Sequence, residues 1–460
     1  MGVSNTTTAT SGLLDIQGQN PSLFKLYTQI CSIYAVPDPS SHDTIASTLR
    51  SGLFRLMETF PWLAGNVINE GACEGNTGTF RIIRTDEIPL VIKDLRSIPS
   101  APTLDDLRRR NFPMSMLDEK LIAPCLTIHV PGETTGLAVD AAPVFAVQAN
   151  FITGGLMLTL VGQHNVMDMT GQNQIMNWFS KACHAHRFTP EEISMGSINR
   201  ADVIPLLEDS VNLEPEIAHQ IVKSPLSTQK APSQPPPSTW GYIVFSATAS
   251  VALKSWATKT MTLPSGFIST DDSISALIWK YISRARIPRF KPDQESRFAR
   301  ALDVRTSVGA PAAYTGVLTS MAYSAETLDN LDTSPLGVIA TDLRKQLDPV
   351  KIGRNVRALA TFNTRAADKT KTSITANMDG SLDVMLSSWA KVDSFDLDFD
   401  LGLGKPEAVR RPAFLPVEGL VYILPRSPAG EIPAAICLRD DDWERLKNDK
   451  EFLHYAEYVG

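Results

Sequence analysis

A histidine and an aspartate stand four residues apart in the segment 162–172, which reads GQHNVMDMTGQ. His164 can act as a general base near neutral pH, because an imidazole titrates close to physiological pH. Asp168 can orient the turn or pair with an arginine. A pattern this short also arises by chance, so two packing residues at the end of a strand are the alternative interpretation.

A glycine-rich segment, DLGLGKP, begins at Asp400. Gly402 and Gly404 allow positive φ angles and a close approach of backbone to a neighbour. A phosphate-binding P-loop is excluded, because Phe399 and Pro406 stand where that motif needs a glycine and a hydroxyl residue. We therefore expect a structural loop here.

Two further groups of polar residues interrupt apolar sequence. Ser387, Ser388 and Trp389 carry hydroxyl and indole donors that could bind a carbonyl or an oxyanion, although such triplets also occur at ordinary strand ends. Asp303 and Arg305 stand in a predicted apolar strand. A buried charge is costly unless it is paired, so Arg305 is expected to form a buried salt bridge with another carboxylate.

Other common catalytic arrangements are not supported. The cluster CHAH at 183–186 has ligand-type side chains, but no further spaced ligand completes a zinc site. No GxSxG nucleophile elbow occurs. The five cysteines are odd in number and scattered, which indicates neither a disulfide framework nor a zinc ribbon. We expect no metal.

Hydrophobic periodicity indicates the elements that position these residues. Helical spacing is predicted over 44–59, 170–183, 249–260 and 274–282, with Thr270 or Asp271 as the cap of the last helix. Strands are predicted over 144–152, 155–162 and 242–246. His164 then lies between a strand and a helix, where side chains reach the edge of a sheet. The alternation of the two element types predicts a mixed α/β fold.

The chain of 460 residues is long enough for two lobes. A Pro- and Ser-rich stretch at 224–238 predicts a linker between an N-terminal lobe, 1–223, and a C-terminal lobe, 239–460. The net charge of −7 argues against nucleic acid and anionic membranes as partners. No secretory signal or membrane span is visible, so we expect a cytoplasmic protein, acting as a monomer.

Taken together, the two motifs resemble those of the BAHD acyltransferases, HxxxD and DFGWG(K)P. Here 235 residues separate His164 from Asp400, about the separation found in that family. Stretches such as LYTQICSIY, FPWLAGNV, FISTDDSISALIWK and VMLSSWAKV are similar to fungal trichothecene 3-O-acetyltransferases. The resemblance runs from about residue 23 to the C-terminus. Leucine replaces both aromatic residues of DFGWG, and Met169 replaces the glycine that often follows HxxxD.

The resemblance implies a two-lobed fold like that of chloramphenicol acetyltransferase, with mixed sheets, flanking helices and a channel between the lobes. It implies acetyl-CoA as co-substrate and a small alcohol as acceptor, with His164 as the general base and no acyl-enzyme. Asp168 is expected to pair with Arg305, and Asp400, Gly402 and Gly404 to be structural. The expected CoA contacts are Lys254, Ser269, Thr270, Ser387, Ser388 and Trp389.

The acceptor and the reaction class leave alternatives. The C-3 hydroxyl of a trichothecene is favoured over another fungal secondary-metabolite alcohol, with Phe112, Met114, Met116 and Leu117 as a possible apolar lining. A non-catalytic binding protein would not need both motif residues. Condensation enzymes use a carrier-bound thioester and have a second histidine where this chain has Gln163.

Overall fold

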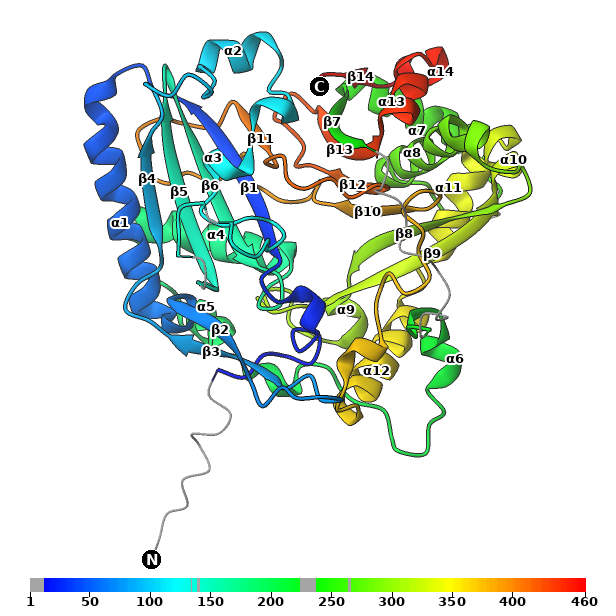
Figure 1. The fold of residues 1–460 in the computed structure, drawn as a ribbon, viewed down its shortest axis with the longest axis horizontal. Helices are drawn as coiled ribbons and strands as arrows, with labels where there is room; N and C mark the ends of the chain where they lie inside the picture. The colour runs from blue at the N-terminus through cyan, green and yellow to red at the C-terminus, as the bar shows by residue number, and fades with distance from the viewer. Residues whose placement is uncertain (1–11, 134, 139–140, 224–236, 264–265) are drawn as a thin grey trace, which may run out of the picture.

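The computed structural model describes residues 12–133, 135–138, 141–223, 237–263 and 266–460. Within them the strands form two large mixed sheets and one hairpin (Figure 1). The strands are β1 (Tyr27–Ala35), β2 (Gly65–Glu70), β3 (Thr79–Arg84), β4 (Leu90–Asp94), β5 (Phe145–Ile152), β6 (Gly155–Gln163), β7 (Ser238–Phe245), β8 (Glu295–Asp303), β9 (Thr319–Thr327), β10 (Val384–Ser388), β11 (Ala408–Arg410), β12 (Leu420–Ile423), β13 (Ile432–Arg439) and β14 (Glu457–Tyr458). The helices are α1 (His42–Thr59), α2 (Leu104–Arg109), α3 (Glu119–Ile122), α4 (Met169–Cys183), α5 (Pro190–Gly196), α6 (Glu214–Ile217), α7 (Ala247–Lys259), α8 (Thr270–Arg286), α9 (Arg305–Val308), α10 (Leu328–Thr333), α11 (Leu336–Lys345), α12 (Pro349–Arg365), α13 (Asp440–Lys447) and α14 (Lys450–Leu453).

The first sheet has the strand order β11-β1-β6-β5-β4 in the described part of the chain. β1 and β6 pair antiparallel, with Tyr27 opposite Gln163, and every residue of β5 and β6 is buried. The apolar faces of α1 and α4 pack into one core with this sheet, through residues such as Leu49 and Phe179. This core fixes the end of β6, after which the HxxxD motif begins.

The second sheet has the order β14-β7-β13-β12-β10-β8-β9 among the described strands. Its β10 runs parallel to both β8 and β12, which places the carboxyl ends of these strands at the same edge. α8 is buried along nearly its whole length and packs with α7 and α11 on this sheet. Figure 1 shows these helices grouped on the far side of the second sheet from the first.

One segment from the C-terminal half crosses to the first sheet. Along residues 395–401 the odd-numbered side chains, from Phe395 to Leu401, are buried in the N-terminal core, and the aspartates between them are exposed. The chain then enters β11, which pairs with β1. The alternation of buried and exposed side chains is typical of a strand, yet residues 395–401 pair with no neighbouring strand among the described residues. They are held by packing instead.

Most of the predicted elements are confirmed, with boundaries shifted by one to four residues. The strand expected to carry Arg305 is an exception, because β8 ends at Asp303 and Arg305 is the first residue of α9. The cap of α8 is Ser269, whereas Thr270 or Asp271 was expected, so the prediction is wrong by one or two residues. Of the predicted linker, 224–238, residues 224–236 lie outside the described residues, and Ser238 already begins β7, so the boundaries of the lobes stay a prediction.

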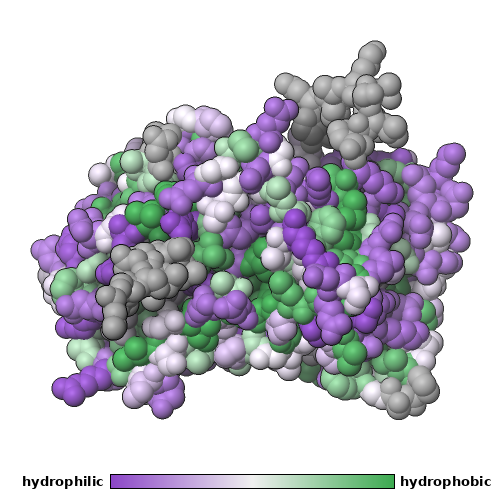
Figure 2. Space-filling model, turned by 90° about the horizontal axis from the view of Figure 1, so that it is seen from below, coloured by the Kyte–Doolittle hydropathy of each residue, from purple (hydrophilic) through white to green (hydrophobic). Residues whose placement is uncertain are grey.

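In the described part of the chain, no helix combines the length and the apolar composition that crossing a bilayer requires. The face seen in Figure 2 is polar over much of its area, with apolar side chains in separate patches. Scattered apolar residues of this kind are normal for a protein surface.

Candidate active site

His164 lies directly after β6, where the first sheet ends. Its backbone N–H donates to the Leu26 carbonyl at 2.7 Å, which ties it to the segment that enters β1. The ring nitrogen Nδ1 is buried. Burial lowers the pKa of His164, and the nearby Asp168 opposes that shift only in part. A neutral imidazole is the form that a general base requires.

The carboxylate of Asp168 joins three segments of the chain. It caps α4 by accepting from the Gly171 N–H at 2.8 Å. Arg305 donates to both of its carboxylate oxygens at 2.9 Å, and the Leu318 N–H donates at 2.8 Å. The predicted ion pair between Asp168 and Arg305 is thus present, and it links α4 of the first sheet to α9 and β9 of the second.

The DLGLGKP loop lies far from His164. Asp400 is 3.7 Å from His184, which follows the C-terminal end of α4, whereas Asp168 caps the other end. A helix of 15 residues is about 22 Å long, so the structure does not bring the two motifs together.

The glycines of this loop serve its backbone geometry. Gly402 and Gly404 have φ of +70° and +71°, as expected. A Cβ at either position would meet open space, so the close approach that was also considered does not occur. Among the described residues, no group of three or more histidines, cysteines and acidic residues is arranged to hold a metal ion, the region of His184 included.

The residues predicted to contact CoA gather where α8 begins and β10 ends. The Ser269 hydroxyl forms a capping box with Asp272. The Ser388 hydroxyl donates to Asp271 at 2.6 Å, which brings β10 against the start of α8 beside Thr270. The buried Trp389 donates its indole N–H to the Ser387 hydroxyl at 3.1 Å.

A cavity of about 610 Å³ opens beside this cluster and is lined by both Lys254 and Thr270. Two cations that the sequence did not single out, Lys259 and Arg426, line it too. In the described part of the chain, none of the three cations has a carboxylate partner within salt-bridge distance. Three unpaired positive charges around one cavity suit an anionic ligand such as a phosphate group.

The side chains proposed as an apolar lining belong to the core. Phe112 and Leu117 are buried in a small cluster with Leu104 and Leu107, and Met114 is fully buried in the main N-terminal core. Their density of methionine and phenylalanine reflects packing.

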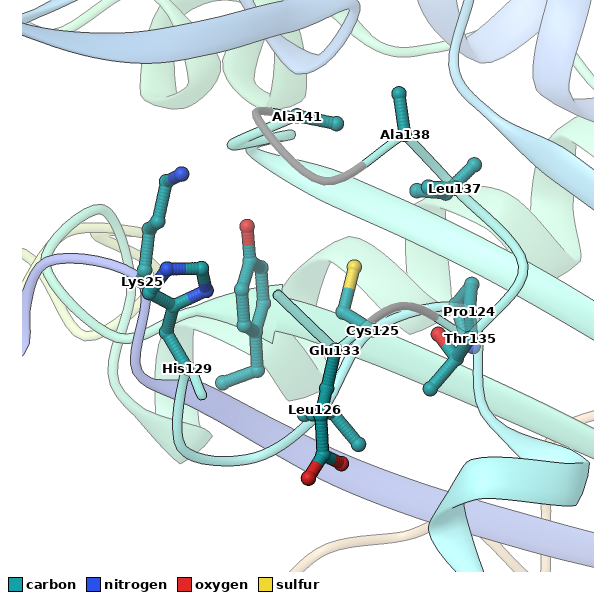
Figure 3. Close-up of a pocket in the computed structure, with 11 residues that line it drawn as sticks. Lys25, Pro124, Cys125, Leu126, His129, Glu133, Thr135, Leu137, Ala138 and Ala141 are labelled. Atoms are coloured by element: carbon teal, nitrogen blue, oxygen red, sulfur yellow. The ribbon is translucent and has the colours of Figure 1, made fainter. Parts of the chain in front are cut away.

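A different pocket lies next to the strand pair that carries His164 (Figure 3). Lys25 and His129 stand on one side of it, and Leu137 and Ala138 on another. Lys25 and His129 also line the adjoining cavity of about 400 Å³, together with Phe24 and other residues. No sequence motif marks this region, because most of its residues come from separate, irregular segments.

Two family models match this chain. The model described as "Trichothecene 3-O-acetyltransferase-like N-terminal domain" matches residues 26–183, and the model described as "Transferase family" matches residues 117–453. The chain belongs to this transferase family. The resemblance to BAHD acyltransferases and the predicted enzyme class, an O-acyltransferase, are confirmed.

Curated relatives match over nearly the full length. The trichothecene 3-O-acetyltransferase of Saccharomyces cerevisiae is 51% identical over 452 residues, which cover 97% of this chain and 95% of the relative. That of Fusarium sporotrichioides is 47% identical over 449 residues, or 97% of each chain. An O-acetyltransferase of Cryptosporiopsis sp. is also 47% identical, over 98% of each chain.

Solved structures of family members share the whole fold. The Fusarium graminearum enzyme complexed with coenzyme A and deoxynivalenol superposes with a TM-score of 0.93 at 45% identity, covering 98% of this chain and 100% of that one. The F. sporotrichioides enzyme with coenzyme A and T-2 has a TM-score of 0.90 at 45% identity, with the same coverage. The expected two-lobed α/β fold is confirmed.

Proposed function

We propose that this transferase moves the acetyl group of acetyl-CoA to the C-3 hydroxyl of a trichothecene. The observation that carries the proposal is His164, a histidine with a buried Nδ1 and a lowered pKa at the strand–helix junction, in a chain that matches trichothecene 3-O-acetyltransferases over nearly its full length. The complexes of its relatives with coenzyme A and trichothecenes support the same pair of substrates.

In this mechanism His164 acts as the general base. Acetyl-CoA supplies an acyl group already activated as a thioester, so no acyl-enzyme is needed. His164 removes the proton of the acceptor hydroxyl as its oxygen forms the new bond to the acetyl carbon. The carbon–sulfur bond breaks, and the proton on His164 passes to the leaving sulfur. Asp168 takes no part in this transfer, because Arg305 and backbone N–H groups occupy its oxygens.

CoA is proposed to bind along the second sheet. Lys254, Lys259 and Arg426 would hold its phosphates, since all three line one cavity. Thr270 lines the same cavity, and Ser388 lies beside it through its bond to Asp271. These residues lead from the charged cavity to the end of β10, a path suited to the pantetheine arm. Ser269, Ser387 and Trp389 would shape that path, because the Ser269 hydroxyl donates to Asp272 and the Ser387 hydroxyl accepts the indole N–H of Trp389.

A second class of acceptor, another fungal secondary-metabolite alcohol, also has specific support. The O-acetyltransferase of Cryptosporiopsis sp. is as similar to this chain as the F. sporotrichioides enzyme. The test is kcat/KM for a 3-hydroxytrichothecene against unrelated terpenoid and polyketide alcohols, with release of free CoA thiol as the measurement. A value for the trichothecene no higher than the others would overturn the proposed acceptor and leave acetyl transfer standing.

The oligomeric state and the cellular compartment of the protein are also part of the proposal. We infer a monomer, since His164, Arg305 and the cations of the CoA cavity all come from one chain, and we infer the cytoplasm, where the five free cysteines would stay reduced. Sedimentation analysis and the location of a tagged protein in its own cells test these inferences. A stable dimer or a secreted protein would contradict them.

A further inference from the structure

Gln163 is fully buried, and its carboxamide bonds to two separate segments of the chain. Its Oε1 accepts from the Lys25 N–H at 3.1 Å. Its Nε2 donates to the carbonyls of Ala142 at 2.8 Å and Pro143 at 3.1 Å. An uncharged carboxamide supplies both the donor and the acceptor that these contacts need.

Both bonded segments contact the backbone around His164. Lys25 has a φ of +54°, the left-handed region that non-glycine residues rarely adopt. The next residue, Leu26, provides the carbonyl that receives the His164 N–H at 2.7 Å. On the other side, the Val144 carbonyl, next to Pro143, accepts the N–H of Gln163 itself at 3.0 Å.

The main chain of Gln163 also anchors the turn that carries the base. Its carbonyl accepts the N–H groups of Val166 at 2.9 Å and Met167 at 3.1 Å. The pocket of Figure 3 lies between the same two segments, with Lys25 on one wall and Ala141 on another. One residue thus connects the turn of His164 to both walls of the neighbouring pocket.

We propose that Gln163 is a positioning residue, which sets the place of His164 by locking the Lys25 turn and the 142–143 segment against it. The inference rests on the proposed function in taking His164 as the base. Gln163 touches no reacting atom in this scheme. It acts through Leu26, whose carbonyl fixes the His164 backbone, so its loss displaces the base. A displacement of about 1 Å can lower a rate about 100-fold.

The first test replaces Gln163 by methionine, which keeps the length and removes the donor and the acceptor. We expect Gln163→Met to lower kcat by about 10- to 100-fold, with a smaller change in KM for acetyl-CoA. The crystal structure of the variant should show Lys25 leaving positive φ, or the contact between His164 and Leu26 broken. A kcat within twofold of wild type, or an unchanged backbone at these residues, overturns the proposal.

The matched control is Gln148→Met. Gln148 is an equally buried carboxamide on β5, and it donates to the Leu121 carbonyl at 2.9 Å, away from the Lys25 turn. This variant should lose thermal stability and keep kcat within twofold. An equal fall in kcat for the two variants would reduce Gln163 to a general packing role and overturn the proposal.

A second variant decides the matter if Gln163→Met does not fold. Gln163→Glu keeps an acceptor for Lys25, and above the pKa of its carboxyl group it cannot donate to Ala142 and Pro143. A fall of fivefold or more in kcat at pH 8.5 supports the proposal, and a kcat within twofold overturns it. The two hypotheses fail in different ways. If the wild-type enzyme transfers no acetyl group, the proposed function is refuted. The crystal structures of the variants still show whether Gln163 positions the backbone of His164.

Discussion

At the scale of single residues, burial determines what His164 can do. The end of β6 places the imidazole inside the molecule, where the charged form is penalised, so its pKa falls below the ordinary value. Asp168, which supplies the carboxylate of the motif, bonds to Arg305 and to backbone N–H groups. We therefore propose separate roles for the two motif residues, proton transfer for His164 and assembly of the site for Asp168.

Removing the imidazole tests the first task. We expect His164→Ala to lower kcat by a factor of about 10² to 10⁴, the usual contribution of a general base. The melting temperature should change little. His454→Ala, at an exposed histidine, is the control and should keep full activity. Near-normal turnover of the His164→Ala enzyme would show that another group takes the proton.

The pH profile tests the environment of the base. Because burial lowers the pKa of His164 below its ordinary value of 6.5, more than half of the imidazole is neutral at that pH. The acid limb of kcat/KM should therefore be centred below pH 6.5, with one proton bound. Profiles at several acetyl-CoA concentrations identify the group as belonging to the free enzyme. An acid limb centred above pH 6.5 would contradict this assignment.

At the scale of elements, the sequence predicted regular segments well and junctions less well. Helix α4 and strands β5 and β6 were found because their apolar periodicity is long and unbroken. The cap of α8 was misplaced by one or two residues, since Ser269 and Thr270 both carry a hydroxyl that can cap. Arg305 was assigned to a strand because apolar neighbours hide the turn after Asp303. Residues 395–401 alternate like a strand but pack without a partner, a distinction that one sequence does not contain.

The ion pair between Asp168 and Arg305, which connects α4 with α9, gives a prediction at this scale. Asp168→Asn leaves the buried guanidinium of Arg305 without its main counter-charge, and breaking such a pair costs about 3–5 kcal/mol. Asp303→Asn removes a contact of 2.8 Å to the same arginine, but Asp303 is 45% exposed, so it should cost about 1 kcal/mol or less. The free energy of unfolding in urea measures both. A stable Asp168→Asn enzyme with kcat abolished would instead assign Asp168 to the chemistry.

At the scale of the whole molecule, the site is an assembly of distant segments. Residues 395–401 and β11 fasten the second half of the chain to the first sheet, and the Asp168–Arg305 pair joins the lobes beside His164. The charged cavity likewise combines α7 with Arg426 from the loop between β12 and β13. Sequence reasoning found Lys254 and missed Arg426, because no local pattern connects positions that only the tertiary fold brings together.

The charged cavity is tested by removing its cations together. In the variant Lys254→Gln, Lys259→Gln, Arg426→Gln, three exposed charge contacts of about 0.5 kcal/mol each are lost, which corresponds to about a tenfold rise in KM for acetyl-CoA. The value of kcat should stay within twofold, because the cavity is proposed to bind the phosphate end of CoA, away from the reacting thioester. Wild-type KM should also rise with salt, and that of the variant should rise less, since screening acts on the removed charges. Lys291→Gln, at an exposed lysine elsewhere, is the control for net charge. If the KM of the triple variant and its salt dependence match those of wild type, the phosphates of CoA bind at another place.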